Sequence, residues 1–166
     1  MLLSIVILAF ATGKFTSNLL GANSVGASDV YLTKINASNG VDVWFKTFGG
    51  TMDDSGEIID LDLNNNLLIT GSFSSTMDCN SGAGTNILTS NGNSDCFVAK
   101  YSQTGTFLSG FSFGGSGNEK INGVHIDMGG NYNLTGYFED VVDFDFDSTQ
   151  TLLTSNGLKD IFVTRY

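Results

Sequence analysis

The sequence predicts an all-β fold assembled from a repeated unit of four short antiparallel strands. One strand-like segment occurs three times at near-constant spacing, and recurrence at a fixed period is the signature of a repeat architecture. The segments are rich in β-branched and aromatic residues and are bounded by Gly, Asn, Ser and Asp, which is typical of strands and turns. The three copies of the segment occupy residues 29–35, 95–101 and 160–166, at spacings of 66 and 65 residues.

Other motifs keep the same period. They are Thr-Gly-x-Phe (12–15, 70–73 and 135–138), Phe-Gly-Gly (48–50 and 113–115) and Leu-Thr-Ser-Asn-Gly (88–92 and 153–157). The connection from Thr-Gly-x-Phe to the thrice-repeated segment spans 14 residues in the first copy and 22 in the other two. The first copy therefore lacks eight residues in one connecting segment.

Hairpins and a fourth strand complete the unit. Residues 57–63 and 67–73 flank the turn cluster 64–66, and this arrangement returns at 124–128 and 132–138. Residues 107–113 supply a further strand before the second Gly-Gly pair. Apolar residues rarely recur at helical spacing, so no helix is expected. Four short strands per copy, joined by turns, describe a β-propeller blade.

The ordered motifs resemble the bacterial β-propeller repeat family known as SBBP, for seven-bladed β-propeller. The resemblance covers roughly residues 9–166 and rests on the motifs above, with 142–145 as a further element. This family often has Pro where the chain has Phe146. The resemblance implies propeller architecture and an extracellular or cell-surface setting, without implying one activity.

The length sets a limit on closure. We expect one repeat region over residues 1–166, with a partial copy at 1–56, a full copy at 57–121 and a partial copy at 122–166. About two and a half repeats are too few for a closed ring, since propellers typically have about four to eight blades. The chain is therefore expected to be a partial or open propeller. It is a piece of a longer protein, an assembling subunit or an open stack of blades.

The charge excludes some partners. A formal net charge of −10 disfavours nucleic acid and anionic membrane surfaces as partners. Residues 1–11 are almost wholly apolar, but they are too few to span a bilayer, and no Lys or Arg occurs ahead of Lys14 to form a basic n-region. Two interpretations stay open for this segment: a buried strand of the first copy, or the remnant of a signal peptide.

Two cysteines are candidates for a disulfide. Cys79 and Cys96 occupy positions that hold Phe144 and Ile161 one period later. If the two sites touch inside a blade, a disulfide would fit an oxidising compartment. The alternative is two buried free thiols. Zinc is not expected, because the single histidine lies far from both cysteines in the sequence.

An acidic run is the candidate metal site. Asp143, Asp145 and Asp147 alternate with Phe, so on a strand their carboxylates would share one face. Oxygen ligands at alternating positions are typical of calcium loops, but position twelve is Thr154 instead of Glu. Calcium is one interpretation, and a solvated edge that resists strand pairing is the other.

Recurring charged residues are expected to belong to the framework, because a specific site rarely appears in every copy. An Asp begins each copy of the thrice-repeated segment and is expected to bond to nearby backbone. A basic residue is the last but one of each segment and is expected to pair with a neighbouring Asp or to lay its stem on the sheet, with a binding stripe as the alternative. These residues are Asp29, Asp95, Asp160, Lys34, Lys100 and Arg165. The single histidine, His125, has no triad partners in the sequence. Trp44 is expected to pack in the core or between blades, with a carbohydrate-stacking platform as the alternative.

The sequence therefore predicts a non-enzymatic structural or protein-interaction module of a larger secreted or cell-surface protein. Its expected partners are a protein or further blades of the same or another chain, which includes a homo-oligomer. No catalytic residue is assigned, and calcium is the one cofactor considered. A propeller that binds a glycan or calcium is the alternative. An enzyme with catalytic groups at a channel mouth is a third hypothesis.

Overall fold

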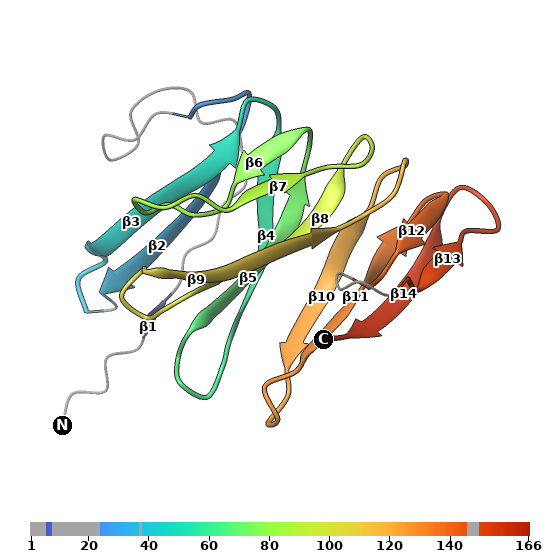
Figure 1. Cartoon of the computed structure of the whole chain (residues 1–166). Helices are drawn as coiled ribbons and strands as arrows, with labels where there is room; N and C mark the ends of the chain where they lie inside the picture. The colour runs from blue at the N-terminus through green and yellow to red at the C-terminus, as the bar shows by residue number, and fades with distance from the viewer. Residues whose placement is uncertain (1–5, 8–23, 37, 146–149) are drawn as a thin grey trace.

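A computed structural model describes residues 6–7, 24–36, 38–145 and 150–166. These residues form strands, turns and connecting segments without a helix, which confirms the all-β prediction. The described residues form four sheets, and the three largest follow one another along the chain, with the C-terminal one at the opposite side from the N-terminal one (Figure 1). No helix long and apolar enough to cross a bilayer occurs in the described part of the chain.

The second of these sheets is the complete unit. It has four antiparallel strands in the order β4-β5-β8-β9. Their bounds are β4 (Asp54–Leu61), β5 (Leu67–Phe73), β8 (Asp95–Tyr101) and β9 (Phe107–Phe113). The four-stranded unit predicted from the sequence is therefore present in this copy.

The first and third sheets contain strands that correspond to parts of this four-stranded unit. The five-stranded first sheet holds β1 (Val6–Ile7), β2 (Val30–Asn36) and β3 (Asp42–Gly50), followed by β6 (Thr76–Asp78) and β7 (Ile87–Thr89). The third sheet holds β10 (Lys120–Ile126), β11 (Tyr132–Phe138) and β14 (Asp160–Arg165). β1, which comes from the apolar segment 1–11, pairs antiparallel with β2. The rest of that segment lies outside the described residues.

Two predicted strands begin earlier than expected. β4 starts at Asp54 instead of residue 57, and β10 starts at Lys120 instead of residue 124. Each strand contains a register shift at an equivalent place, between Gly56 and Ile58 and between Ile121 and Gly123. Pairing continues past this irregularity, which apolar alternation does not reveal.

The 22-residue connections form small hairpins that join neighbouring sheets. They comprise β6 (Thr76–Asp78) with β7 (Ile87–Thr89), and β12 (Val141–Asp143) with β13 (Leu152–Thr154). β6 pairs with the end of β3 through Gly50 and Met77. One period later, Gly115 pairs with Val142. Each hairpin therefore reaches back to the last strand of the preceding copy.

Two hydrophobic clusters hold the three sheets together. On β8, Phe97, Ala99 and Tyr101 belong to the cluster shared with the first sheet. Cys96 and Val98 belong to the cluster shared with the third sheet. Successive side chains of a strand point to opposite faces, so β8 is covered on both faces by a neighbouring sheet. This explains why its sequence is apolar almost throughout.

Candidate functional site

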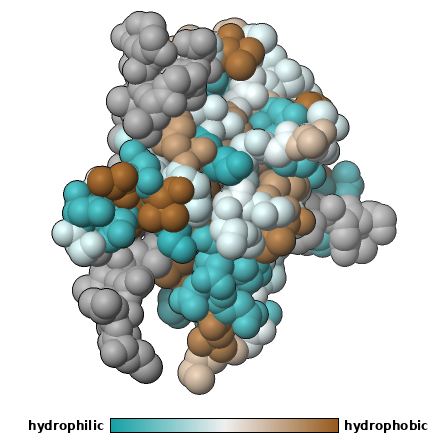
Figure 2. Space-filling view, turned by 90° about the vertical axis from the view of Figure 1, so that its left-hand side faces the viewer, coloured by the Kyte–Doolittle hydropathy of each residue, from teal (hydrophilic) through white to brown (hydrophobic). Residues whose placement is uncertain are grey.

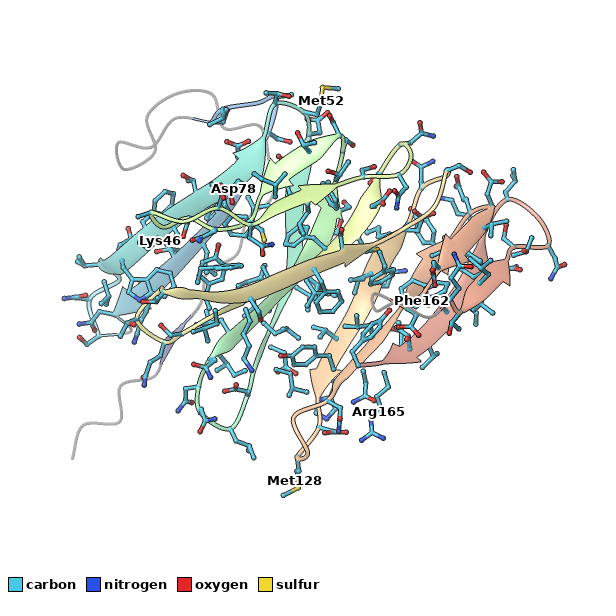
Figure 3. All side chains as sticks on the ribbon, viewed as in Figure 1. Lys46, Met52, Asp78, Met128, Phe162 and Arg165 are labelled. Carbon is cyan, nitrogen blue, oxygen red and sulfur yellow. The ribbon has the colours of Figure 1, made fainter. Side chains whose placement is uncertain are left out.

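The outer face of the third sheet carries exposed apolar side chains. Ile161 and Val163 on β14 are 85% and 78% exposed. The positions one period earlier, Cys96 and Val98, are 0% and 1% exposed because the third sheet packs on them. Phe162 points the other way, into the space between the second and third sheets (Figure 3).

The edge of β14 is open as well. β8 pairs with β5 on one side and with β9 on the other, whereas the described pairing of β14 is to β11 alone. An unpaired edge presents backbone donors and acceptors that can accept another strand. Face and edge together make a candidate interaction surface, which we call the β14 surface.

A second candidate is an open hollow of about 340 Å³ at the opposite end of the molecule. Its side chains include Lys46 of β3, Phe107 of β9, Asn80 of the β6–β7 loop and the hydroxyls of Thr104 and Thr106. The described surface at this end is mixed, with hydrophilic areas between smaller hydrophobic ones (Figure 2). Amide, hydroxyl and ammonium groups beside one aromatic ring suit a small polar ligand.

Trp44 packs against Gly105, one of the residues that line this hollow. Its ring lies 3.2 Å from where a Cβ on Gly105 would stand, and its Nε1 donates to the Gln103 carbonyl at 3.2 Å. Lys34 donates to the same carbonyl at 3.3 Å. Trp44 therefore links the first sheet to the β8–β9 turn, as the packing interpretation expects.

The predicted disulfide is not formed. Cys79 and Cys96 are both free and buried, but they belong to different hydrophobic clusters, one on each side of the second sheet. Asn86 donates to the Cys79 sulfur at 3.1 Å. Burial raises the pKa of Cys79 to about 11 and raises the pKa of Cys96 well above its usual value. The free-thiol alternative describes both residues.

The acidic run does not continue as a strand. β12 ends at Asp143, and Asp145 lies beyond it. The Asp143 carboxylate accepts backbone N–H bonds from Asp145 (3.1 Å) and Thr151 (2.9 Å). Asp78 accepts the equivalent pair of bonds one period earlier. Asp143 therefore holds the hairpin loop together, and Asp147 lies outside the described residues.

The recurring aspartates cap turns as expected. Asp29, Asp95 and Asp160 each accept the backbone N–H of the residue four positions earlier, at 2.6, 3.0 and 2.8 Å. These bonds hold the turn before each recurring strand, so the three residues belong to the framework.

Two of the three recurring basic residues pair with an Asp. Lys100 binds Asp62 and Arg165 binds Asp127, both at 2.9 Å. The two aspartates accept several hydrogen bonds, and the pKa of each is lowered to about 2. His125 lies 3.7 Å from Asp60 across the second and third sheets.

Sequence reasoning missed a second set of acids. Asp54 and Glu119 follow Phe-Gly-Gly at the same distance, 65 residues apart, and both are buried. Burial, with nearby negative charges, raises the pKa of each to about 7. The sequence does contain a signal for these acids, because an acidic residue follows the second Gly of Phe-Gly-Gly by four residues in both copies.

Comparisons with known proteins leave the chain unassigned. A scan against protein-family models gave no match, and a search of curated proteins found no similar sequence.

Proposed function

We propose that the chain is a non-enzymatic structural or protein-interaction module of a larger secreted or cell-surface β-propeller protein, in which each sheet is a blade. The observation that carries this proposal is the exposure of Ile161 and Val163 at positions that the preceding sheet buries against its neighbour. The partner for the β14 surface is another blade of the same repeat. The SBBP-like motifs and the net charge of −10 support the proposed setting.

Recurring main-chain links support a blade as the partner. The Asp54 N–H donates to the Ser28 carbonyl at 2.8 Å, and the Glu119 N–H donates to the Ser94 carbonyl at 2.9 Å. The hairpin links through Gly50 and Gly115 recur in the same way. Because these links use backbone atoms, a further unit can form them without a special side-chain pair.

Extending the chain by one period tests the proposal. Residues 102–166 appended after Tyr166 would continue the repeat in register, because the period is 65 residues. An Ile161→Cys thiol should react quickly with a maleimide in the original chain and slowly in the extended one. Leu158→Cys is the matched control, since Leu158 and its counterpart Asn93 are both exposed. Equal reaction of Ile161→Cys in both chains would contradict blade docking.

The hollow at Lys46 favours a second function, the binding of a small polar ligand such as a glycan. A glycan array followed by calorimetry tests it, and Lys46→Ala should weaken any binding found. Lys34→Ala is the control, because the Lys34 ammonium bonds to Gln103. Binding that survives Lys46→Ala unchanged would contradict a site in the hollow.

Calcium remains a candidate ligand near Asp143 and Asp145. Calorimetric titration with calcium tests it on the unmodified chain, with Asp143→Asn as the variant. Heat of binding that Asp143→Asn abolishes would support the site. Its absence in the unmodified chain would contradict it.

A further inference from the structure

A pair of buried carboxyl groups lies at each of the two sheet junctions. Asp29 and Asp54 meet between the first and second sheets, and Asp95 and Glu119 meet between the second and third. All four residues are between 0 and 4% exposed. Each pair joins the residue at the start of a recurring strand to an acid that begins the next sheet.

A glycine makes room for each pair. A Cβ on Gly49 would lie 2.7 Å from an oxygen of Asp29 and 2.7 Å from an oxygen of Asp54. A Cβ on Gly114 would lie 2.5 Å from an Asp95 oxygen and 2.6 Å from a Glu119 oxygen. The first glycine of each Phe-Gly-Gly motif therefore serves a small space that two carboxyl groups share.

The first pair has oxygens that nothing in the described chain satisfies. One oxygen of Asp29 accepts the Val25 N–H at 2.6 Å, and one oxygen of Asp54 accepts the Gly50 N–H at 2.5 Å. The other oxygen of each group is buried without a hydrogen-bond partner. Two ionised carboxylates in this position would repel each other, whereas a protonated one can donate to its neighbour.

The second pair is better satisfied. The Ser90 hydroxyl donates to Asp95 at 3.0 Å, and the Gly115 N–H donates to Glu119 at 2.8 Å. The backbone N–H of Glu139 reaches the other Glu119 oxygen at 3.5 Å. The second pair therefore depends less on a proton than the first.

The charged groups around the pairs are mostly negative. Asp53 acts on Asp54, and Glu139 acts on Glu119. Glu139 has Lys159 beside it at 3.8 Å. Cys96, whose thiol is neutral, also lies within reach of Glu119 and Asp95. No ion pair of the described residues includes any of the four carboxyl groups.

We infer that the two carboxyl groups of each junction share one proton, and that its release weakens the docking of adjacent sheets as the solution becomes alkaline. The folded chain then binds more protons than the unfolded chain between the two states' pKa values. Burial raises the pKa of Asp54 and of Glu119 to about 7, against an unfolded value near 4. The stabilisation is therefore full below about pH 4 and is lost progressively as the pH rises to about 7.

Thermal unfolding of the full chain across this pH range tests the inference. We expect the melting temperature to fall by on the order of 5 °C from about pH 5 to about pH 8. Asp54→Asn should raise the melting temperature at pH 8, because the amide donates without carrying charge. Glu119→Gln should have a smaller effect, and the double variant should lose most of the pH dependence.

Two controls separate an effect of the carboxyl pairs on the melting temperature from the effects of other titrating groups. Asp62→Asn should keep the full slope, because the pKa of Asp62 is about 2 and lies outside the range. Infrared spectra of the unmodified chain at neutral pH should show a protonated carboxyl band that Asp54→Asn and Glu119→Gln reduce. This readout applies even if a variant is too unstable to melt cooperatively.

The inference would be overturned by a melting temperature that is flat from pH 5 to pH 8, by a double variant that keeps the slope, or by the absence of the infrared band. A melting temperature that rises with added calcium but not with acid would also overturn it, since a cation would then occupy the shared space.

Discussion

Strands β8 and β14 have the same sequence motif but different surroundings. β8 lies inside a four-stranded sheet between two hydrophobic clusters, and it is buried along nearly its whole length. β14 has one face on the second sheet and the other in solvent. The comparison teaches that the next sheet along the chain decides whether the outer face of a strand is core or surface.

The difference has an energetic consequence. Removing an aliphatic side chain from water contributes about 1.5–3 kcal/mol. Val98 gains this contribution from the third sheet, and Val163 gains none of it on its exposed face. The same substitution should therefore cost more free energy of unfolding on the covered face of β8 than on the exposed face of β14.

The largest expected difference is between Val98→Asp and Val163→Asp. A carboxylate at residue 98 would be buried without a partner, so we expect a loss of about 4 kcal/mol or failure to fold. The same change at the exposed residue 163 should alter the free energy of unfolding by about 0.5 kcal/mol or less. Urea unfolding measures both, and similar losses would contradict the comparison.

The next largest difference in unfolding free energy is expected between the β6–β7 and β12–β13 hairpins. Leu88 of β7, a strand that lies against β9, is 8% exposed and belongs to a hydrophobic cluster, whereas Leu153 of β13 is 45% exposed. Leu88→Ala should cost about 2–3 kcal/mol, and Leu153→Ala should cost about 1 kcal/mol or less. A chevron analysis of each variant measures the loss of unfolding free energy. Equal losses for Leu88→Ala and Leu153→Ala would mean that β9 does not cover the β6–β7 hairpin.

Thiol chemistry distinguishes the covered face directly. Cys96 should react with iodoacetamide far more slowly than an Ile161→Cys thiol, because it is buried and burial raises its pKa. Counting thiols by intact mass after unfolding without reductant should give two for the unmodified chain. A count of zero would restore the disulfide hypothesis.

The smallest difference concerns the recurring ion pairs. Lys100 and Asp62 have side chains 22% and 9% exposed, so Lys100→Ala should cost about 0.5–1 kcal/mol and less at high salt. Arg165 is mostly exposed, and Arg165→Ala should leave the melting temperature unchanged within error. A larger loss at Arg165 would indicate that the β14 surface is already covered in solution.

Much of the strand pattern follows from local sequence. Residues 107–113 form β9 as predicted, and residues 67–73 form β5, because apolar runs between turn residues suffice to place them. The capping bonds of Asp29, Asp95 and Asp160 were predictable for the same reason, since each bond spans four residues.

Contacts between distant residues could not be predicted from the local sequence. Cys79 and Cys96 lie within one copy, yet they face opposite clusters, because the hairpin turns toward the preceding sheet. In the sequence, Asp54 is the second of two adjacent acids and no local pattern distinguishes it from Asp53. Its importance comes from Asp29, which lies 25 residues earlier and meets it only across Gly49.

The sequence by itself determined the strands, the turns and the 65-residue period, because these depend on neighbouring residues and on the alternation of side chains along a strand. The tertiary structure alone decided which faces are covered, which carboxyl groups meet and where the hollow lies. These features depend on how one sheet packs on the next. Packing joins residues that no local pattern relates, as the exposed Val163 and the buried Val98 demonstrate.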